Sequence, residues 1–238
     1  MLATKPRPPA TKSRATFDNL QQLVDSFGGI PASRVLVDPP IGRATVKDLL
    51  RHLDGDSRRL VELVNRTLVE KPMGNKESGL ASYLIRVIGV WSDASGDLGY
   101  VGGEGATWQI LRGLVRLPDV SYISWDRLPN RKMPEAPVPT LAPDLAVEVI
   151  GKGNTKAEMT RKIGEYFTAG VRLVWLVFPK ARTVRVYTSA KDSELLVEAD
   201  TLTGGDVLPG FALPLAKLFE KLPDEPKRKR AKPKKRKK

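Results

Sequence analysis

The fold is decided by residues 143–178, which read PDLAVEVIGKGNTKAEMTRKIGEYFTAGVRLVWLVF. Residues 145–150 are almost continuously apolar, which is typical of a strand buried on both faces. Asn154 or Thr155 can cap a helix that runs from Lys156 to Ala169 and ends at Gly170. Residues 171–178 form a second apolar run. A strand, a helix and a strand in this order predict a βαβ unit.

Weaker patterns surround this unit. Apolar residues at helical spacing predict further helices, and short alternating or apolar runs between turn residues predict strands. Asn65 and Arg66 suit the turn of a hairpin, and a proline-rich stretch predicts a loop. The predicted helices are 18–27, 45–53, 77–91 and 215–222, the strands are 59–64, 67–70, 106–111, 120–125, 183–188 and several within 195–213, and the loop is 129–143.

The composition excludes several kinds of site. The chain has 238 residues, no Cys and one His, His52. It therefore has no disulfide, no thiolate metal site and no zinc site with several histidines. We expect a soluble cytoplasmic protein, because no apolar run reaches the roughly 18 residues of a membrane span and no signal peptide is visible.

The net charge of +13 resides at the two ends of the chain. Residues 1–15 contain four basic residues and residues 227–238 contain ten, and neither segment contains an acid. The remaining body, 16–226, has 26 basic and 27 acidic residues. We therefore predict a disordered basic arm at 1–15, a folded domain at 16–222 and a disordered Lys/Arg-rich tail at 223–238.

Two glycine-rich stretches do not complete a nucleotide-binding motif. Residues 102–105 lack the rest of a dinucleotide fingerprint. Gly151-Lys152-Gly153 lies between a strand and a helix, but it lacks the upstream glycine and the following Ser or Thr of a phosphate-binding loop. His52 is interpreted as a surface or partly packed residue of a short helix.

Three side chains could carry chemistry together. Glu148 lies within the apolar strand, where a carboxylate is costly unless it is paired or binds a metal. Asp119 opens the strand 120–125, and Lys162 falls at the edge of the apolar face of the next helix, from which it can reach inward. Two carboxylates and a lysine suffice for phosphodiester hydrolysis with Mg²⁺. Alternatively, Glu148 is a structural acid paired with Lys162 or Arg161, and Asp119 is a turn residue.

The order of these motifs resembles a known family. The segments PDLAVEVI (143–150), KxxxYxxAGV (162–171) and VWLV (174–177) are similar to those of the Uma-type restriction endonuclease family, within the PD-(D/E)XK nuclease superfamily. RLVELVNRTLVE (59–70), LPDVSYI (117–123), LPGF (208–211) and Leu218-Phe219 match its flanking segments, so the resemblance covers about 45–222.

The resemblance implies an α/β (α+β) fold with a restriction-endonuclease-like mixed β-sheet core flanked by helices. It implies that Asp119 and Glu148 bind Mg²⁺ or Mn²⁺, that Lys162 is the active-site lysine, and that Glu62 completes the site. Asp144 is a nearby second candidate. Ile150 stands where a strand lysine would be, and Gly151-Lys152-Gly153 replaces the Ser-Pro-Ser-like turn of the family. This replacement either places an additional cation beside the scissile phosphate or marks a site that has drifted from the family pattern.

The resulting hypothesis is a metal-dependent endonuclease that hydrolyses DNA, with double-stranded DNA as its partner. The basic tail would bind nucleic acid without sequence preference and hold the protein at the nucleoid. The alternative is a catalytically silent DNA-binding protein with a nuclease fold, and a homodimer stays open. The predicted nucleic-acid contacts are Lys227, Arg228, Lys229, Arg230, Lys232, Lys234, Lys235, Arg236, Lys237, Lys238 and Lys152.

Overall fold

The structure is a computed structural model that describes residues 17–55, 59–72 and 74–222. The predicted arm at 1–15 and tail at 223–238 lie outside the described residues. In the described part of the chain, no helix is both long and apolar enough to cross a membrane.

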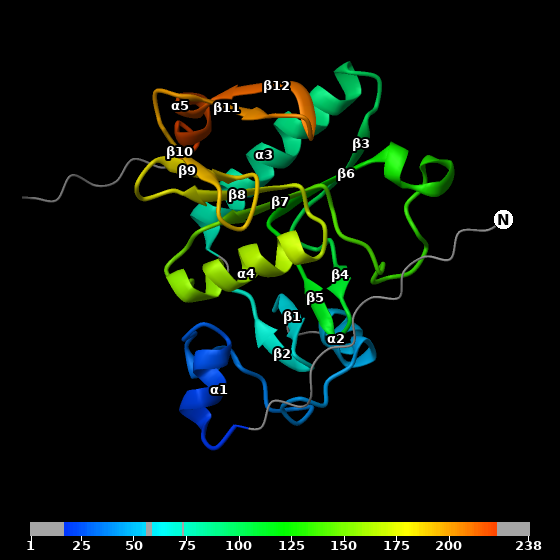
Figure 1. Ribbon diagram of the computed structural model, residues 1–238, viewed down its shortest axis with the longest axis vertical. Coiled ribbons are helices and arrows are strands. Elements are labelled where there is room, and N and C mark those ends of the chain that lie inside the picture. The colour runs from blue at the N-terminus through cyan, green and yellow to red at the C-terminus, as the bar shows by residue number, and fades with distance from the viewer. Residues whose placement is uncertain (1–16, 56–58, 73, 223–238) are drawn as a thin grey trace, which may run out of the picture.

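A mixed six-stranded sheet forms the centre of the fold (Figure 1). Its strands β7 and β8 are parallel, and all other neighbours are antiparallel. Across the sheet the order is β10 (Ser193–Val197), β9 (Thr183–Tyr187), β8 (Leu173–Phe178), β7 (Leu145–Val149), β6 (Val120–Ser124) and β3 (Gly99–Gly102).

The predicted βαβ unit is present as β7, helix α4 (Lys156–Thr168) and β8. Thr155 caps the helix, because its side chain accepts from the Glu158 N–H while the Glu158 side chain accepts from the Thr155 N–H. The helix stops before Gly170, whose φ of +93° is readily adopted only by glycine. These local signals return the chain to the sheet beside β7, where Glu148 faces Leu176 across the parallel pair.

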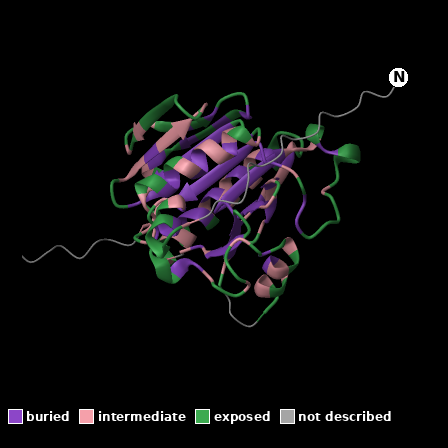
Figure 2. Cartoon of the chain, turned by 60° about the horizontal axis from the view of Figure 1, so that its bottom comes forward, coloured by how far each residue is buried: buried purple, intermediate pink, exposed green. Residues whose placement is uncertain are grey.

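The two faces of this sheet are covered differently. One face packs against α3 (Asn75–Ala94), α5 (Leu215–Phe219) and the hairpin of β11 (Thr201–Gly204) and β12 (Leu208–Pro214) (Figure 1). The other face packs against α4. Figure 2 shows that the central strands are buried along most of their length.

A second sheet of four strands lies on the α4 side (Figure 1). Its order is β2 (Thr67–Glu70), β1 (Val61–Val64), β5 (Leu114–Arg116) and β4 (Trp108–Leu111). The predicted hairpin around Asn65 and Arg66 is confirmed, with both turn residues at positive φ. Outside these strands lie α1 (Leu20–Ser26), the 3₁₀ turn η1 (Ala32–Arg34) and α2 (Val46–Leu53).

Several predicted boundaries were wrong. Residues 99–116, where the sequence predicted a single strand at 106–111, supply three strands that divide between the two large sheets, because β3 pairs with β6 whereas β4 and β5 pair with each other. Two 3₁₀ turns, η2 (Trp125–Arg127) and η3 (Pro129–Arg131), replace the predicted end of a strand and the start of a loop. His52 is half-buried on α2, as the sequence indicated.

Candidate functional site

Glu148 and Asp119 lie on neighbouring strands. Glu148 is the fourth residue of β7, and Asp119 directly precedes β6. Val120 pairs with Val147, and the same antiparallel register, extended by one residue, places Asp119 opposite Glu148. The Asp119 side chain is fixed there, because its Oδ2 accepts from the Val149 N–H at 2.6 Å.

Lys162 reaches this position from α4, as its place on the helical wheel predicted. Its Nζ donates to Glu148 Oε1 at 3.0 Å and to Glu62 Oε1 at 3.1 Å, and its side chain is 2% exposed. Glu62 comes from β1 in the other sheet. The structure therefore brings together all four residues that the sequence proposed for the site: Glu62, Asp119, Glu148 and Lys162.

A second lysine, Lys71, was missed by the sequence analysis. It follows β2, and its buried Nζ lies 2.7 Å from Asp119 Oδ1 and also donates to the Leu117 carbonyl oxygen. Its only sequence signal is its position directly after the predicted hairpin. Nothing local indicates that the residue after that hairpin is buried against the Pro118-Asp119 segment.

Arg116 and Tyr166 complete the network and were also missed. The Arg116 guanidinium donates to Glu62 Oε2 at 2.6 Å and to Glu165 on α4. The Tyr166 hydroxyl donates to Glu148 Oε1 at 2.6 Å. The Tyr166 ring packs in the core on the apolar face of α4, and its hydroxyl is the part that contacts the site.

The pKa of Glu62 is lowered. Burial disfavours the charged form of Glu62, but the nearby cations Lys162, Arg116 and Lys71 more than offset this effect. Burial similarly opposes the charge on Lys71, yet Asp119, Glu148 and Glu62 raise its pKa. These groups are therefore ionised at neutral pH.

The pKa of Glu148, in contrast, is raised. Burial raises its pKa, Lys162 and Lys71 offset this only in part, and the charges of Asp119 and Glu62 raise it further. Burial and the nearby Glu148 also raise the pKa of Tyr166 well above its usual value, which keeps its hydroxyl a hydrogen-bond donor. Half-buried Glu104 has a raised pKa as well, through burial and the charge of Asp119. The surroundings of Glu148 thus disfavour its charged form, unlike those of Glu62.

The adjacent carboxylates of Asp119 and Glu148 offer the oxygen ligands that suit a divalent cation. Mg²⁺ and Mn²⁺ prefer hard oxygen ligands, and Mg²⁺ is often held by one or two carboxylates, with water and substrate phosphate as its other ligands. Among the described residues, no three Asp, Glu or His side chains form a metal-binding group. An ion held by Asp119 and Glu148 would require Lys71 to give up its contact with Asp119.

The turn after β7 is fixed by close packing. A Cβ at Gly153 would lie 2.6 Å from Pro72 Cβ, and a Cβ at Gly151 would lie 3.1 Å from Glu77 Oε1. The glycines therefore let the segment after Lys71 approach the carboxyl end of β7. Lys152 between them is exposed, and in the described part of the chain it forms no hydrogen bond or ion pair with the carboxylate cluster.

Other residues proposed from the sequence lie elsewhere. Asp144, at the opposite end of β7, accepts from the Ser124 N–H and pairs with Arg127, so it has a structural role. Arg161 does not pair with Glu148, since its contacts are with Glu165 and the Ser26 carbonyl oxygen. The ten cations of residues 227–238 lie outside the described residues.

Comparisons with known proteins identify a family and a similar fold. Residues 46–216 match the family model Uma2, described as "Putative restriction endonuclease". A solved structure from Anabaena variabilis ATCC 29413, described as "a putative nuclease belonging to DUF820", has a similar fold with a TM-score of 0.63. It is 21% identical, and the match covers 74% of this chain and 98% of that one. No protein of curated function matches the sequence.

Proposed function

This chain belongs to the Uma2 family, and we propose that it hydrolyses phosphodiester bonds of DNA with the help of Mg²⁺ or Mn²⁺. The observation that carries this proposal is the convergence of Asp119, Glu148 and Lys162 in one buried cluster between the six-stranded sheet and α4. Family membership supports a nuclease, whereas the metal, the DNA substrate and the individual residue roles are ours to propose.

In this proposal Asp119 and Glu148 hold the metal ion. A bound ion would polarise the phosphate and lower the pKa of a coordinated water. The Val149 N–H fixes Asp119, and the Tyr166 hydroxyl fixes Glu148, so both carboxylates are oriented before the substrate arrives.

Lys162 has two tasks. It holds Glu148 and Glu62 at about equal distances, and its ammonium offers positive charge to the phosphate oxygens as negative charge develops on them. Glu62 acts as a positioning residue, because it joins Lys162 to Arg116 and to the Leu117 N–H. The site therefore needs neither a histidine nor a cysteine, in agreement with the composition.

The test is nicking of supercoiled plasmid with Mg²⁺, with Mn²⁺ and with EDTA. In Glu148→Gln the amide oxygen can still accept from Lys162 and Tyr166, so we expect the melting temperature to stay within a few degrees of wild type. Loss of one carboxylate charge should reduce nicking by more than about 100-fold. The exposed Glu220→Gln variant is the matched control and should nick as wild type does. Unchanged nicking by Glu148→Gln would refute the assignment.

One observation favours the alternative, a catalytically silent DNA-binding protein. Lys71 and Lys162 already neutralise Asp119 and Glu148, and all four side chains are buried, as in a purely structural ion-pair network. The two functions differ in their response to metal. A nuclease site binds Mn²⁺ in the folded state and must raise the melting temperature, whereas a silent network leaves it unchanged in wild type and Glu148→Gln alike.

A further inference from the structure

Three arginines from separate loops converge at one end of the four-stranded sheet. Arg43 lies before α2, Arg66 lies in the β1–β2 turn and Arg112 lies in the β4–β5 turn. The backbone holds these loops together, because the Ala44 N–H donates to the Arg66 carbonyl oxygen at 2.8 Å and the Arg66 N–H donates to the Gly113 carbonyl oxygen at 3.5 Å. We call Arg43, Arg66 and Arg112 the arginine cluster.

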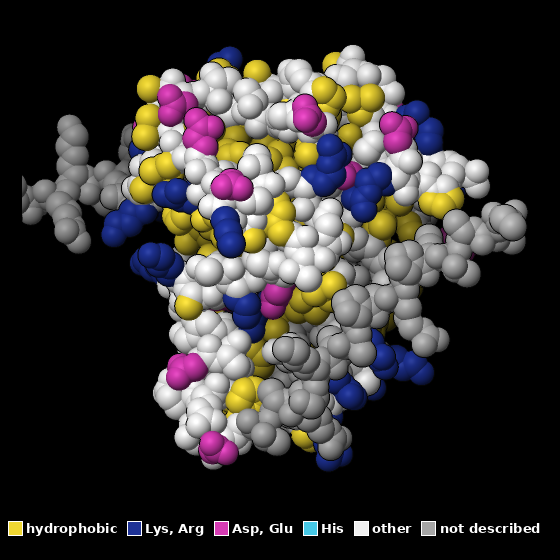
Figure 3. All heavy atoms as spheres, viewed as in Figure 1, with side chains coloured by type: hydrophobic (Ala, Val, Ile, Leu, Met, Phe, Trp, Pro, Cys, Tyr) yellow, Lys and Arg dark blue, Asp and Glu magenta, His cyan; other side chains and the backbone are white. Residues whose placement is uncertain are grey.

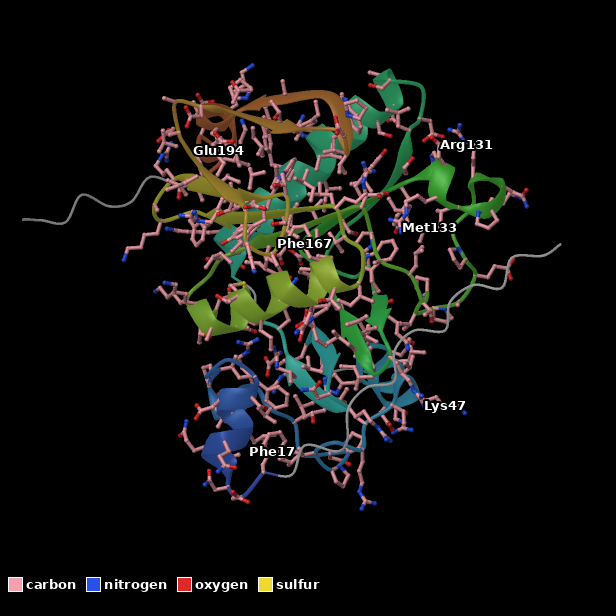
Figure 4. The ribbon with its side chains drawn as sticks, viewed as in Figure 1. Phe17, Lys47, Arg131, Met133, Phe167 and Glu194 are labelled. Atoms are coloured by element: carbon pink, nitrogen blue, oxygen red, sulfur yellow. The ribbon has the colours of Figure 1, made fainter. Side chains whose placement is uncertain are left out.

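The described residues leave the positive charge of the arginine cluster unpaired. All three residues are exposed, and in the part of the chain that the structure describes none of them forms an ion pair or a side-chain hydrogen bond. Asp48, an acid on neighbouring α2, is already bonded to Thr45 and Arg51. Figure 3 shows Lys and Arg side chains at the lower right, where Figure 4 labels Lys47, four residues after Arg43.

The placement of Arg66 beside Arg112 is unfavourable in the protein alone. Strands β1 and β5 pair antiparallel through Leu63 and Val115, and the same register, extended by three residues, brings Arg66 opposite Arg112. A Cβ at Gly113 would lie 3.5 Å from Arg66 Cγ, so the two turns approach closely. Like charges directly opposite each other destabilise a sheet. An anion bound between the two guanidinium groups would remove this cost.

Arg66 also occupies a backbone position that glycine favours. The two-residue β1–β2 turn has φ of +49° at Asn65 and +58° at Arg66. Turns of this kind prefer Asn followed by Gly, because a Cβ is strained in the left-handed region. The second position therefore gives up backbone stability in exchange for a guanidinium group. A strained residue of this kind points to a function for its side chain.

We propose that the arginine cluster binds the phosphate backbone of double-stranded DNA. A guanidinium group is charged at every physiological pH and matches phosphate oxygens with paired N–H donors. All three residues are exposed at the tips of loops, so the cluster is a surface that suits an extended polyanion. A small anion, by contrast, is usually held in a concave site.

Two strands connect the arginine cluster to the candidate site. Glu62 lies four residues before Arg66 along β1, and Arg116 lies four residues after Arg112 along β5. Four residues of strand span about 13 Å. This is less than half of a turn of B-DNA, which is about 34 Å long, so one duplex is long enough to extend over both regions. The choice of DNA as the polyanion rests on the proposed nuclease function, whereas the charge and geometry of the cluster do not.

The test is the salt dependence of duplex DNA binding by the full-length protein in EDTA, measured by fluorescence anisotropy. The cluster variant carries Arg43→Gln, Arg66→Gln and Arg112→Gln. The control variant carries Lys180→Gln, Lys191→Gln and Lys217→Gln, which remove the same charge from exposed positions beside the six-stranded sheet and on α5. In the cluster variant the slope of log K against log salt should become shallower by about 2.7, since each lost phosphate contact contributes about 0.9.

The control variant should keep the slope of wild type. An unchanged slope in the cluster variant, or the same change in both variants, would overturn the proposal. A shallower slope with duplex RNA but not with duplex DNA would overturn the choice of DNA.

A single substitution separates binding from stability. Arg66→Gly removes one guanidinium group and places glycine at a position of positive φ, so the melting temperature should stay at or above that of wild type. DNA binding should nevertheless weaken, with a slope shallower by about 0.9. Wild-type binding by the folded Arg66→Gly protein would contradict the assigned role of this residue.

Chemical protection locates the contact on the unmodified protein. Phenylglyoxal reacts with exposed arginines, and mass spectrometry of peptides measures the reaction at each position. DNA should protect all three residues of the arginine cluster at low salt, whereas Arg86 and Arg172, exposed elsewhere, should react equally with and without DNA. Equal protection of the cluster and of these two controls would overturn the proposal. All of these measurements are made without metal, so their outcome is separable from a failure to nick DNA.

Discussion

The candidate site depends strongly on the positive charge of Lys162. This residue is buried between Glu148 and Glu62, and both carboxylates depend on it. We predict that Lys162→Met, which keeps the length of the side chain but removes its charge, lowers the free energy of unfolding by about 3–5 kcal/mol, because it leaves buried acids uncompensated. Urea unfolding measures this loss. The control is Lys156→Met, at an exposed position on the same helix.

The loss in Lys162→Met should depend on pH. The pKa of Glu148 is already raised, and it rises further without the ammonium. A carboxyl whose folded-state pKa is raised stabilises the protein below its unfolded value, and this contribution is lost as the pH rises through the folded value. Unfolding at pH 8 should therefore show a larger difference from wild type than unfolding at pH 5. An equal loss at both values would contradict the assigned coupling.

At the scale of elements, the start of α4 anchors the N-terminal segment. Arg34 of η1 donates to Glu158 at 2.7 Å and 3.1 Å and also to the carbonyl oxygens of Glu70 and Gly153. It thereby links the end of β2, the turn after β7 and the first turn of α4. Burial would raise the pKa of Glu158, but its hydrogen bonds to Arg34 and the charge of Lys162 lower it overall.

This link predicts acid sensitivity. A carboxyl with a lowered folded-state pKa stabilises the protein above its unfolded value, near 4.5, and the contribution is lost as the pH falls through the lower folded value. Glu158→Gln should therefore be less stable than wild type at pH 7, and the difference should shrink below pH 4.5. Thermal melts across this range measure it, and hydrogen exchange should locate the opening at residues 20–36. Glu220→Gln should keep the pH dependence of wild type.

At the scale of the whole molecule, charge is divided between a nearly neutral body and a basic tail. We predict that truncation after Pro226 weakens DNA binding and flattens its salt dependence, because each phosphate contact contributes about 0.9 to the slope of log K against log salt. Fluorescence anisotropy in EDTA at several salt concentrations measures both effects. Nicking at low salt should persist. An unchanged slope would show that the tail does not contact phosphates.

The sequence by itself determined the βαβ unit and three of the four residues placed at the centre of the site. Apolar runs, a capping box and a terminal glycine are signals that span only a few residues, so they indicate β7, α4 and β8 without knowledge of any tertiary contact. Glu148 and Lys162, 14 residues apart, face each other because that unit is local. Asp119 was identified because the strand that it opens could be predicted from the sequence. Glu62 was suggested only by the family resemblance.

Only the tertiary structure decided what surrounds them. Glu62 and Lys162 are 100 positions apart, and Glu62 and Arg116 are 54 apart, on strands of a sheet whose order no local pattern records. Lys71 entered the site for the same reason, whereas Tyr166 belongs to the local unit of β7 and α4, 18 positions from Glu148. A buried charge is stabilised by whichever opposite charge the packing brings within about 3 Å, and that partner is chosen by strand order and helix placement rather than by neighbours in sequence.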